Sequence, residues 1–207
     1  MGIPVMILGE SGSGKSASLR NFSPDEVGVF NIAGKRLPFR NTLKVANNVG
    51  YGTIIAGLKK ASKKAYVIDD SQYLLCFEMF DRAKETGYQK FTDMAQHFYS
   101  LIQTILRETP DDVIVYFLHH TELVGDRRKA KTIGKMLDEK LTVEGLFTIV
   151  LLCETDGDRH WFTTQSDGST TAKSPMGMFD REIDNDLKAV DAIIREYYGL
   201  TQGGNES

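Results

Sequence analysis

The chain has 207 residues, of which 41% are hydrophobic and 26% charged, and its formal net charge is -3. This length and composition are typical of one globular domain with a sizeable core. The near-balanced charge excludes a global positive field, so any contact with nucleic acid must come from a local patch. We expect a single domain over residues 1–199 and a disordered polar tail over 200–207.

Two further features bear on the cellular environment. No apolar stretch has the length of a membrane span. Cys76 and Cys153 both lie in apolar runs without C-x-x-C spacing, which is typical of small buried side chains in a reducing compartment. The sequence therefore predicts a cytoplasmic protein that does not contact a membrane.

A glycine-rich stretch near the amino terminus carries the strongest signal. An apolar run from Ile3 to Leu8 leads directly into GESGSGKS at residues 9–16, which fits the pattern G-x-x-x-x-G-K-[S/T] without a mismatch. Such glycines let successive backbone N–H groups surround phosphate oxygens, while the lysine reaches the β- and γ-phosphates and the serine binds Mg²⁺. A glycine- and serine-rich turn that fits by chance is the alternative. Because a strand is expected before the loop and a helix after it, we predict an ATP site formed by Gly9, Glu10, Ser11, Gly12, Ser13, Gly14, Lys15, Ser16 and Ala17.

An acidic pair follows a short apolar strand, Ala65 to Ile68. The carboxyl ends of parallel strands gather beside a bound nucleotide, where a carboxylate commonly holds Mg²⁺. We therefore predict that Asp69 and Ser16 form the magnesium site. Asp70 either polarises the attacking water or caps a helix that begins near Gln72.

Two histidines end the next buried strand, which covers residues 113–118. If this strand neighbours the first one, a polar side chain at its tip lies near the γ-phosphate and can report its loss. His119 and His120 are therefore candidates for this role, and a purely structural role is the alternative.

Two segments are rich in cations. Residues 35–40 form a basic loop interrupted by a proline, which we interpret as a solvated connection rather than a nucleotide contact. Residues 124–135 are bounded by glycines and should form a mobile loop. That loop either tracks a DNA backbone or is a solvated surface, and its candidate DNA contacts are Arg127, Arg128, Lys129, Lys131 and Lys135.

The remaining pattern predicts an α/β fold with three layers. Further strands are expected at 27–32 and 147–153, and a hairpin turn at 156–159 leads into an antiparallel extension that covers 160–164 and continues through 170–179. Helices are expected at 17–22, 51–61, 72–86, 91–108 and 184–198, of which 91–108 has the clearest amphipathic spacing.

Together, the glycine-rich loop, the YVIDDS stretch at 66–71, the FLHHT stretch at 117–121 and the AKSPMG stretch at 172–177 resemble small RecA-like P-loop ATPases of bacteriophage genomes. That group includes single-strand annealing and recombination ATPases. The resemblance covers about residues 3–180. It implies a central, mostly parallel sheet with a C-terminal antiparallel hairpin extension, ATP at subunit borders, assembly into a ring or filament, single-stranded DNA as partner, and the host cytoplasm as location.

The resemblance also implies roles for single residues. His119 or His120 would sense the γ-phosphate, and Lys173 would act on the nucleotide of a neighbouring subunit. RecA-like proteins usually have a catalytic glutamate at the end of the second strand, where this chain has Asn31 to Gly34. Hydrolysis is then slow, or Glu10 or Asp70 substitutes for that glutamate.

Three functions remain open from the sequence. The first is an ATPase that acts on single-stranded DNA in recombination or replication. The second is a small-molecule P-loop kinase, in which Arg127 and Arg128 would imitate a lid, although the strand-rich extension after residue 147 argues against a compact kinase. The third is a nucleotide-gated loader or scaffold with little turnover.

Overall fold

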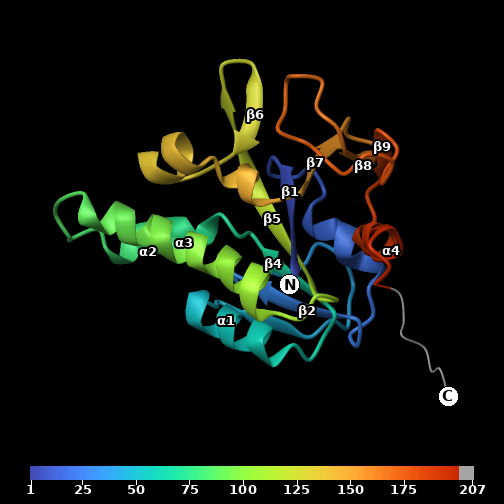
Figure 1. Ribbon diagram of the computed structural model, residues 1–207, viewed down its shortest axis with the longest axis horizontal. Coiled ribbons are helices and arrows are strands. Elements are labelled where there is room, and N and C mark those ends of the chain that lie inside the picture. The colour runs from blue at the N-terminus through green and yellow to red at the C-terminus, as the bar shows by residue number, and fades with distance from the viewer. Residues whose placement is uncertain (201–207) are drawn as a thin grey trace.

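The computed structural model describes residues 1–200 and consists of a central sheet with helices on both faces (Figure 1). Among the described residues, the sheet has nine strands in the order β3-β2-β4-β5-β1-β7-β8-β9, and β6 pairs with β5. The strands are β1 Ile3–Gly9, β2 Val27–Asn31, β3 Val45–Asn47, β4 Ala65–Asp69, β5 Ile114–Val124, β6 Arg127–Ala130, β7 Ile149–Thr155, β8 His160–Thr163 and β9 Glu182–Asp184.

The helices flank this sheet. Four α-helices and three short helices of other types occur within residues 1–200. They are the 3-10 helix η1 Ser16–Asn21, α1 Tyr51–Lys60, α2 Tyr73–Asp81, α3 Gln89–Glu108, the π-helix η2 Met136–Leu141, the 3-10 helix η3 Val143–Leu146 and α4 Leu187–Tyr197. The expected α/β class with a mostly parallel sheet is confirmed.

The centre of the sheet is parallel. β1 pairs in parallel with β5 on one side and β7 on the other, and β4 continues the parallel arrangement beyond β5. Residues 4–9 of β1 are all buried, which explains their uninterrupted apolar sequence, because a parallel strand covered on both faces reads as a continuous hydrophobic run. The carboxyl ends of these strands consequently lie along one edge, at the top in Figure 1.

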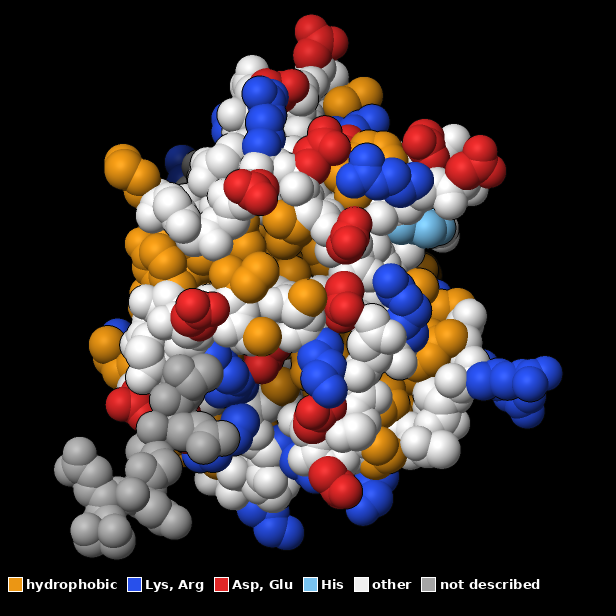
Figure 2. Space-filling view, turned by 90° about the vertical axis from the view of Figure 1, so that its right-hand side faces the viewer, with side chains coloured by type: hydrophobic (Ala, Val, Ile, Leu, Met, Phe, Trp, Pro, Cys, Tyr) orange, Lys and Arg blue, Asp and Glu red, His pale blue; other side chains and the backbone are white. Residues whose placement is uncertain are grey.

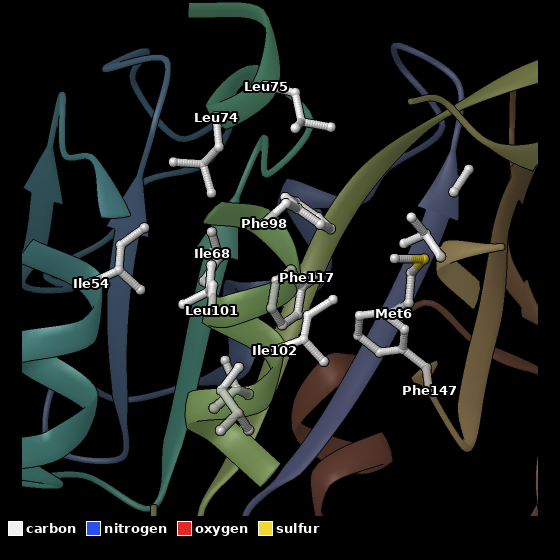
Figure 3. Packing of buried hydrophobic residues seen from close by; sticks show 14 of the residues in the cluster. Met6, Ile54, Ile68, Leu74, Leu75, Phe98, Leu101, Ile102, Phe117 and Phe147 are labelled. Carbon is white, nitrogen blue, oxygen red and sulfur yellow. The ribbon is translucent and has the colours of Figure 1, made fainter. Parts of the chain in front are cut away.

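Side chains alternate between two cores along each strand. Met6, Ile68 and Phe117 belong to one cluster, together with apolar residues of α1, α2 and α3. Figure 3 shows Phe98, Leu101 and Ile102 of α3 directed at this face of the sheet. The second cluster covers the opposite face and joins Val5 and Ile7 to α4 and η1. The helix layers thus fix the sheet from both sides.

Several boundaries differ from the sequence-based expectation. The residues expected to form a mobile loop at 124–135 include β6, which pairs antiparallel with the extended end of β5. Strand β6 was not predicted because its sequence, Arg127 to Ala130, is mostly basic, and because β5 continues beyond His119 with residues that are only partly buried or exposed. Edge strand β3 lacks an apolar pattern and was missed, and α2 ends at Asp81 rather than Thr86.

The carboxyl-terminal extension is antiparallel as expected, but its third strand is different. β8 pairs with β7, and β9 pairs with β8. Residues 170–179 form no strand; Lys173 makes an isolated antiparallel bridge with Val150 instead. After the end of helix α4, the Leu200 N–H donates to the Arg195 carbonyl. The remainder of the predicted disordered tail, 201–207, lies outside the described residues.

No helix in residues 1–200 combines the length and apolar character needed to cross a membrane. Figure 2 shows the face formed by the β8, β9 and α4 side of the molecule, where acidic and basic side chains alternate with apolar areas. This mixture agrees with the near-zero net charge and provides no extended field of one sign on that face.

The core contacts give a first prediction. Replacing Phe98, which is fully buried, by Ala should lower the free energy of unfolding by about 3–5 kcal/mol, because apolar transfer is lost and a cavity remains. Phe80, which is 69% exposed, provides the matched control, and Phe80→Ala should change stability by less than about 0.5 kcal/mol. Urea denaturation measures both; equal losses would contradict the assignment of Phe98 to the core.

Candidate functional site

The glycine-rich loop connects β1 to η1 at the carboxyl edge of the sheet. Its backbone needs glycine at specific positions. A Cβ atom at Gly9 would lie 2.5 Å from the Ser13 hydroxyl and 2.8 Å from the Cys153 carbonyl oxygen. Gly14 has φ of 102°, a conformation that other residues rarely adopt, and its Cβ would meet His160. The expected helix after the loop is present, but as a single 3-10 helix of six residues.

Carbonyl oxygens of the loop are bound by side chains. Lys15 Nζ donates to the carbonyl oxygens of Gly9 and Glu10, both at 2.8 Å. His160 Nδ1 donates to the Ser13 carbonyl at 2.8 Å. Within the described chain, no hydrogen bond occupies the N–H groups of Gly12, Gly14 and Lys15. The loop therefore offers backbone donors to an anion, in the arrangement known as a nest.

Lys15 is the cation inside this loop. Burial lowers the pKa of its ammonium group, while Cys153 and the carboxylates of Asp70 and Asp69 act in the opposite direction. Two loop carbonyls accept two of the three N–H donors of this ammonium group. An anion in the loop would provide the strong countercharge that these carbonyls do not.

Ser16 and Asp69 meet across 53 positions of sequence, with the Ser16 hydroxyl donating to Asp69 Oδ1 at 2.8 Å. Asp69 ends β4, and burial raises the pKa of its carboxyl group. Within residues 1–200 there is no cluster of three or more His, Cys, Asp or Glu side chains that could hold a metal ion. This oxygen pair fits Mg²⁺ bound with a nucleotide, because that ion keeps several waters and takes phosphate oxygens besides one or two protein ligands.

Asp70 points into the same region from a different backbone conformation. Its φ of 58° lies in the left-handed region, which aspartate tolerates better than most residues. One carboxylate oxygen accepts a hydrogen bond from His120 Nε2 at 3.1 Å, and the other pairs with Lys35 Nζ at 2.7 Å. Burial would raise the pKa of Asp70, but His120 and Lys35 together lower it. The helix-cap alternative fails, because α2 has no side-chain cap.

The two histidines at the end of β5 have different surroundings. His119 is fully buried, where its Nε2 donates to the Lys131 carbonyl and its Nδ1 lies 2.9 Å from the Ser71 hydroxyl. Burial lowers the pKa of His119 to about 4, so it is neutral at physiological pH. His120 faces the cleft and contacts Asp70. Of the two predicted sensor residues, the structure therefore brings only His120 into the site.

A cleft of about 370 Å³ unites these groups. The sequence-based predictions had included most of its lining residues, which are Ser11, Gly12, Gly14, Lys15, Ser16, Ala17, Asp69, Asp70 and His120. Lys35, Arg36, Pro38 and His160 also line it. The Lys35–Asp70 ion pair corrects the interpretation of residues 35–40 as a solvated connection. The sequence shows that this loop is basic, but the contact depends on the pairing of β2 with β4, which only the fold reveals. Nothing in the sequence around His160 indicated a contact with the loop.

Glu10 lies on the other side of the loop from this cleft. It lines a separate pocket of about 130 Å³ with Ser13, Arg128 and Glu154. Its side chain is 70% exposed and lies 3.6 Å from Arg128, which also contacts Glu154 at 3.1 Å. In this arrangement Glu10 faces the β5–β6 hairpin rather than Asp70.

The predicted DNA contacts are largely engaged within the protein. Arg127 donates to the Thr170 carbonyl, Arg128 pairs with Glu10 and Glu154, and Lys129 pairs with Asp138. Lys131 has an exposed side chain, while its backbone binds both histidines of β5. Lys135 precedes η2. A phosphate backbone would have to compete with the internal partners of Arg128 and Lys129.

Lys173 is not part of the cleft of its own chain. Its backbone bonds to Val150, which pairs with Met6, three residues before Gly9. The predicted action of Lys173 on a neighbouring subunit remains a prediction.

The fold and the loop define a class in general terms: a mostly parallel α/β protein with a glycine-rich loop, a buried lysine and an acidic pair at one edge of the sheet. Searches against protein-family models and against curated proteins find no match to this chain. Its function must therefore be argued from the site itself.

The burial of His119 gives a prediction for stability. Its pKa of about 4 in the folded protein is below the usual unfolded value of about 6.5, so unfolding takes up a proton between these two pH values. Its contribution is fully present above about pH 6.5 and should fall by up to about 3 kcal/mol as the pH drops to 4. His119→Gln should flatten this part of the stability–pH curve measured by urea denaturation. A variant curve parallel to the wild-type curve would contradict the prediction.

Proposed function

We propose that the chain is a Mg²⁺-dependent P-loop ATPase that binds ATP in the cleft between Gly12 and His120. The observation that carries this proposal is the hydrogen bond between Ser16 and Asp69. It brings together a hydroxyl that follows the loop lysine and a carboxylate at the end of a separate strand. These are the two oxygens that a magnesium ion bound to a triphosphate requires from the protein.

Each part of the cleft then has a task. The free N–H groups of the loop and Lys15 hold the phosphates, and their charge stabilises the negative charge that develops during transfer. Ser16 and Asp69 would hold Mg²⁺, which would supply positive charge beside the phosphate oxygens. His120 and Asp70 are the groups that we assign to the terminal phosphate and its attacking water, because His120 lies on β5, the neighbour of β1, and Asp70 follows β4, the next strand beyond β5.

The reaction itself is a phosphoryl transfer to water. The water oxygen forms a bond to the terminal phosphorus while the bond between that phosphorus and the bridging oxygen breaks. The bridging oxygen keeps the electron pair as part of ADP. One hydrogen of the water stays on the oxygen that joins phosphorus and the other passes to a phosphate oxygen, so both leave with inorganic phosphate. The protein contributes mainly position and charge to such a step.

A RecA-like identity is part of the proposal. The adjacency of β5 to β1 supports it, since this was the condition under which a strand-tip residue would lie near the γ-phosphate. The antiparallel β7–β8–β9 extension is also compatible with the resemblance. Assembly into a ring or filament and action on single-stranded DNA in phage recombination or replication follow from the same proposal.

A specific observation favours a second candidate, a nucleotide-gated loader with little turnover. Asn31 occupies the end of β2, and its side chain is used in the turn that follows, where it accepts from the Gly34 N–H. Asp70, which would have to replace the missing glutamate, is already bound by Lys35 and His120. Rates of ATP hydrolysis with and without single-stranded DNA distinguish the two candidates.

Lys15→Ala tests the placement of the nucleotide. We expect ATP affinity to fall at least tenfold, because a charge-assisted contact to phosphate typically contributes about 1.5–3 kcal/mol. Isothermal titration calorimetry with Mg²⁺ and ATP measures this change, and circular dichroism checks that the fold is retained. Lys60→Ala, at the exposed end of α1, is the matched control. Unchanged ATP affinity in Lys15→Ala would remove the loop from the proposed site.

The DNA partner is tested on the hairpin. Arg127→Ala/Lys131→Ala removes two cations while leaving the Arg128–Glu10 pair intact. If these residues contact the backbone, affinity for single-stranded DNA should fall and the slope of log K against log salt should decrease by roughly 0.7 per lost contact. Lys60→Ala/Lys84→Ala removes the same charge elsewhere. Fluorescence anisotropy that gives one slope for all variants would exclude this face as the DNA contact.

A further inference from the structure

Lys35 has an unusual position for a residue in an exposed basic loop. Its side chain is 63% exposed, yet its Nζ pairs at 2.7 Å with Asp70, whose side chain is only 9% exposed. The same Nζ lies 5.5 Å from the centre of the Tyr73 ring, and that ring packs edge-on against His120. The Lys35 side chain is therefore largely solvated, while its ammonium group contacts Asp70 in the wall of the cleft.

The turn after β2 directs Lys35 to this place. Asn31 is buried at the strand end, where its amide accepts from the Gly34 N–H and donates to the carbonyl of Lys35 and to Asn47 on β3. Gly34 has φ of 66°, and a Cβ there would lie 2.1 Å from Asn48 Oδ1. Two neighbouring strands therefore fix the backbone of Lys35, while its exposed side chain extends to Asp70.

The Lys35–Asp70 contact is easily broken. Water solvates the exposed Lys35 ammonium group when it leaves, and Asp70 then keeps the hydrogen bond from His120 Nε2 at 3.1 Å, so the buried carboxylate is not left without a partner. Asp70 raises the pKa of Lys35, so the side chain is charged when it faces the cleft. A triphosphate, with several negative charges close together, is a stronger partner for this ammonium group than a single carboxylate.

We propose that Lys35 is a phosphate-recruited cation: it covers Asp70 in the free protein and moves to the terminal phosphate of a bound nucleoside triphosphate, which releases Asp70 to orient the attacking water. This inference rests on the proposed ATP site and assigns a residue of that site. It also assigns a role to Asn31 at the end of β2. Asn31 positions Lys35, whereas a glutamate at this place would orient the attacking water.

In this role, Lys35 would favour ATP over ADP, because only ATP has the terminal phosphate that Lys35 contacts. A residue that contacts only the third phosphate contributes to ATP affinity and not to ADP affinity, whereas a residue that merely holds Asp70 in place affects neither selectively. Lys35→Ala should therefore lower the preference for ATP over ADP by roughly tenfold, the usual effect of losing one charge-assisted hydrogen bond. Lys35→Arg should retain most of this preference because the charge is kept.

The test uses the full chain with Mg²⁺ and measures ATP and ADP dissociation constants by calorimetry for wild type, Lys35→Ala, Lys35→Arg and Arg40→Ala. Arg40 is an exposed cation of the same loop that does not line the cleft, so Arg40→Ala controls for lost charge. A selective loss of ATP affinity in Lys35→Ala alone supports the proposal. An unchanged ATP-to-ADP ratio in Lys35→Ala overturns it.

The result separates the two levels of inference. If wild type binds ATP, Lys15→Ala weakens binding at least tenfold and Lys35→Ala keeps the ATP-to-ADP ratio, only the role of Lys35 is refuted. If wild type binds neither nucleotide, the proposed function fails and the role of Lys35 fails with it. An equal loss of ATP preference in Arg40→Ala would show a general effect of charge and would also refute the specific role of Lys35.

Discussion

The parallel pairing of β1, β5 and β4 is the constraint on which the candidate site depends. Gly9 pairs with His120 in register, and Asn31 pairs with Asp69 at the end of the neighbouring strand pair. Parallel strands with helical connections end at one edge of the sheet. Polar side chains separated by many residues are thereby brought together without any of them needing to stabilise the fold.

The two helix layers make this possible. Hydrophobic burial on both faces fixes the strands independently of the edge. The edge can then contain buried charged groups, such as Lys15 and Asp69, whose burial lowers the stability of the fold. Lys15 and Asp69 have pKa values shifted towards their neutral forms by burial, and a bound Mg²⁺–triphosphate would favour both charged forms.

Local sequence predicted the parts of this site that are contiguous. The loop at 9–16 and the strand ending at Asp69 each have a pattern that depends on near neighbours, namely glycine spacing and an apolar run, and the core helix at 91–108 was predicted in the same way from its apolar periodicity. Contacts made through the sheet order were not predictable in the same way. His160 reaches the loop only because β8 folds back on β7, and Lys35 reaches Asp70 only because β2 pairs with β4.

The same limit explains the hairpin. In β5, residues 119–124 follow the buried part of the strand with a half-polar pattern, and the cations of β6 resemble a solvated loop. Their partners, including Glu10, Glu154 and Asp138, come from three other segments of the chain. The number of cations in this segment is therefore larger than the number that lack an acidic partner among the described residues and could pair with a ligand.

The acidic pair shows how backbone conformation determines the chemistry of the site. In a regular strand, adjacent side chains point to opposite faces, so one of two consecutive aspartates would face away from the cleft. The left-handed conformation at Asp70 ends the strand and turns its carboxylate towards the cleft that Asp69 also lines. Asp69 then faces the Ser16 hydroxyl, while Asp70 faces the two cationic or hydrogen-bonding side chains of Lys35 and His120. Two identical side chains thus acquire different partners, a hydroxyl group for Asp69 and two nitrogen donors for Asp70.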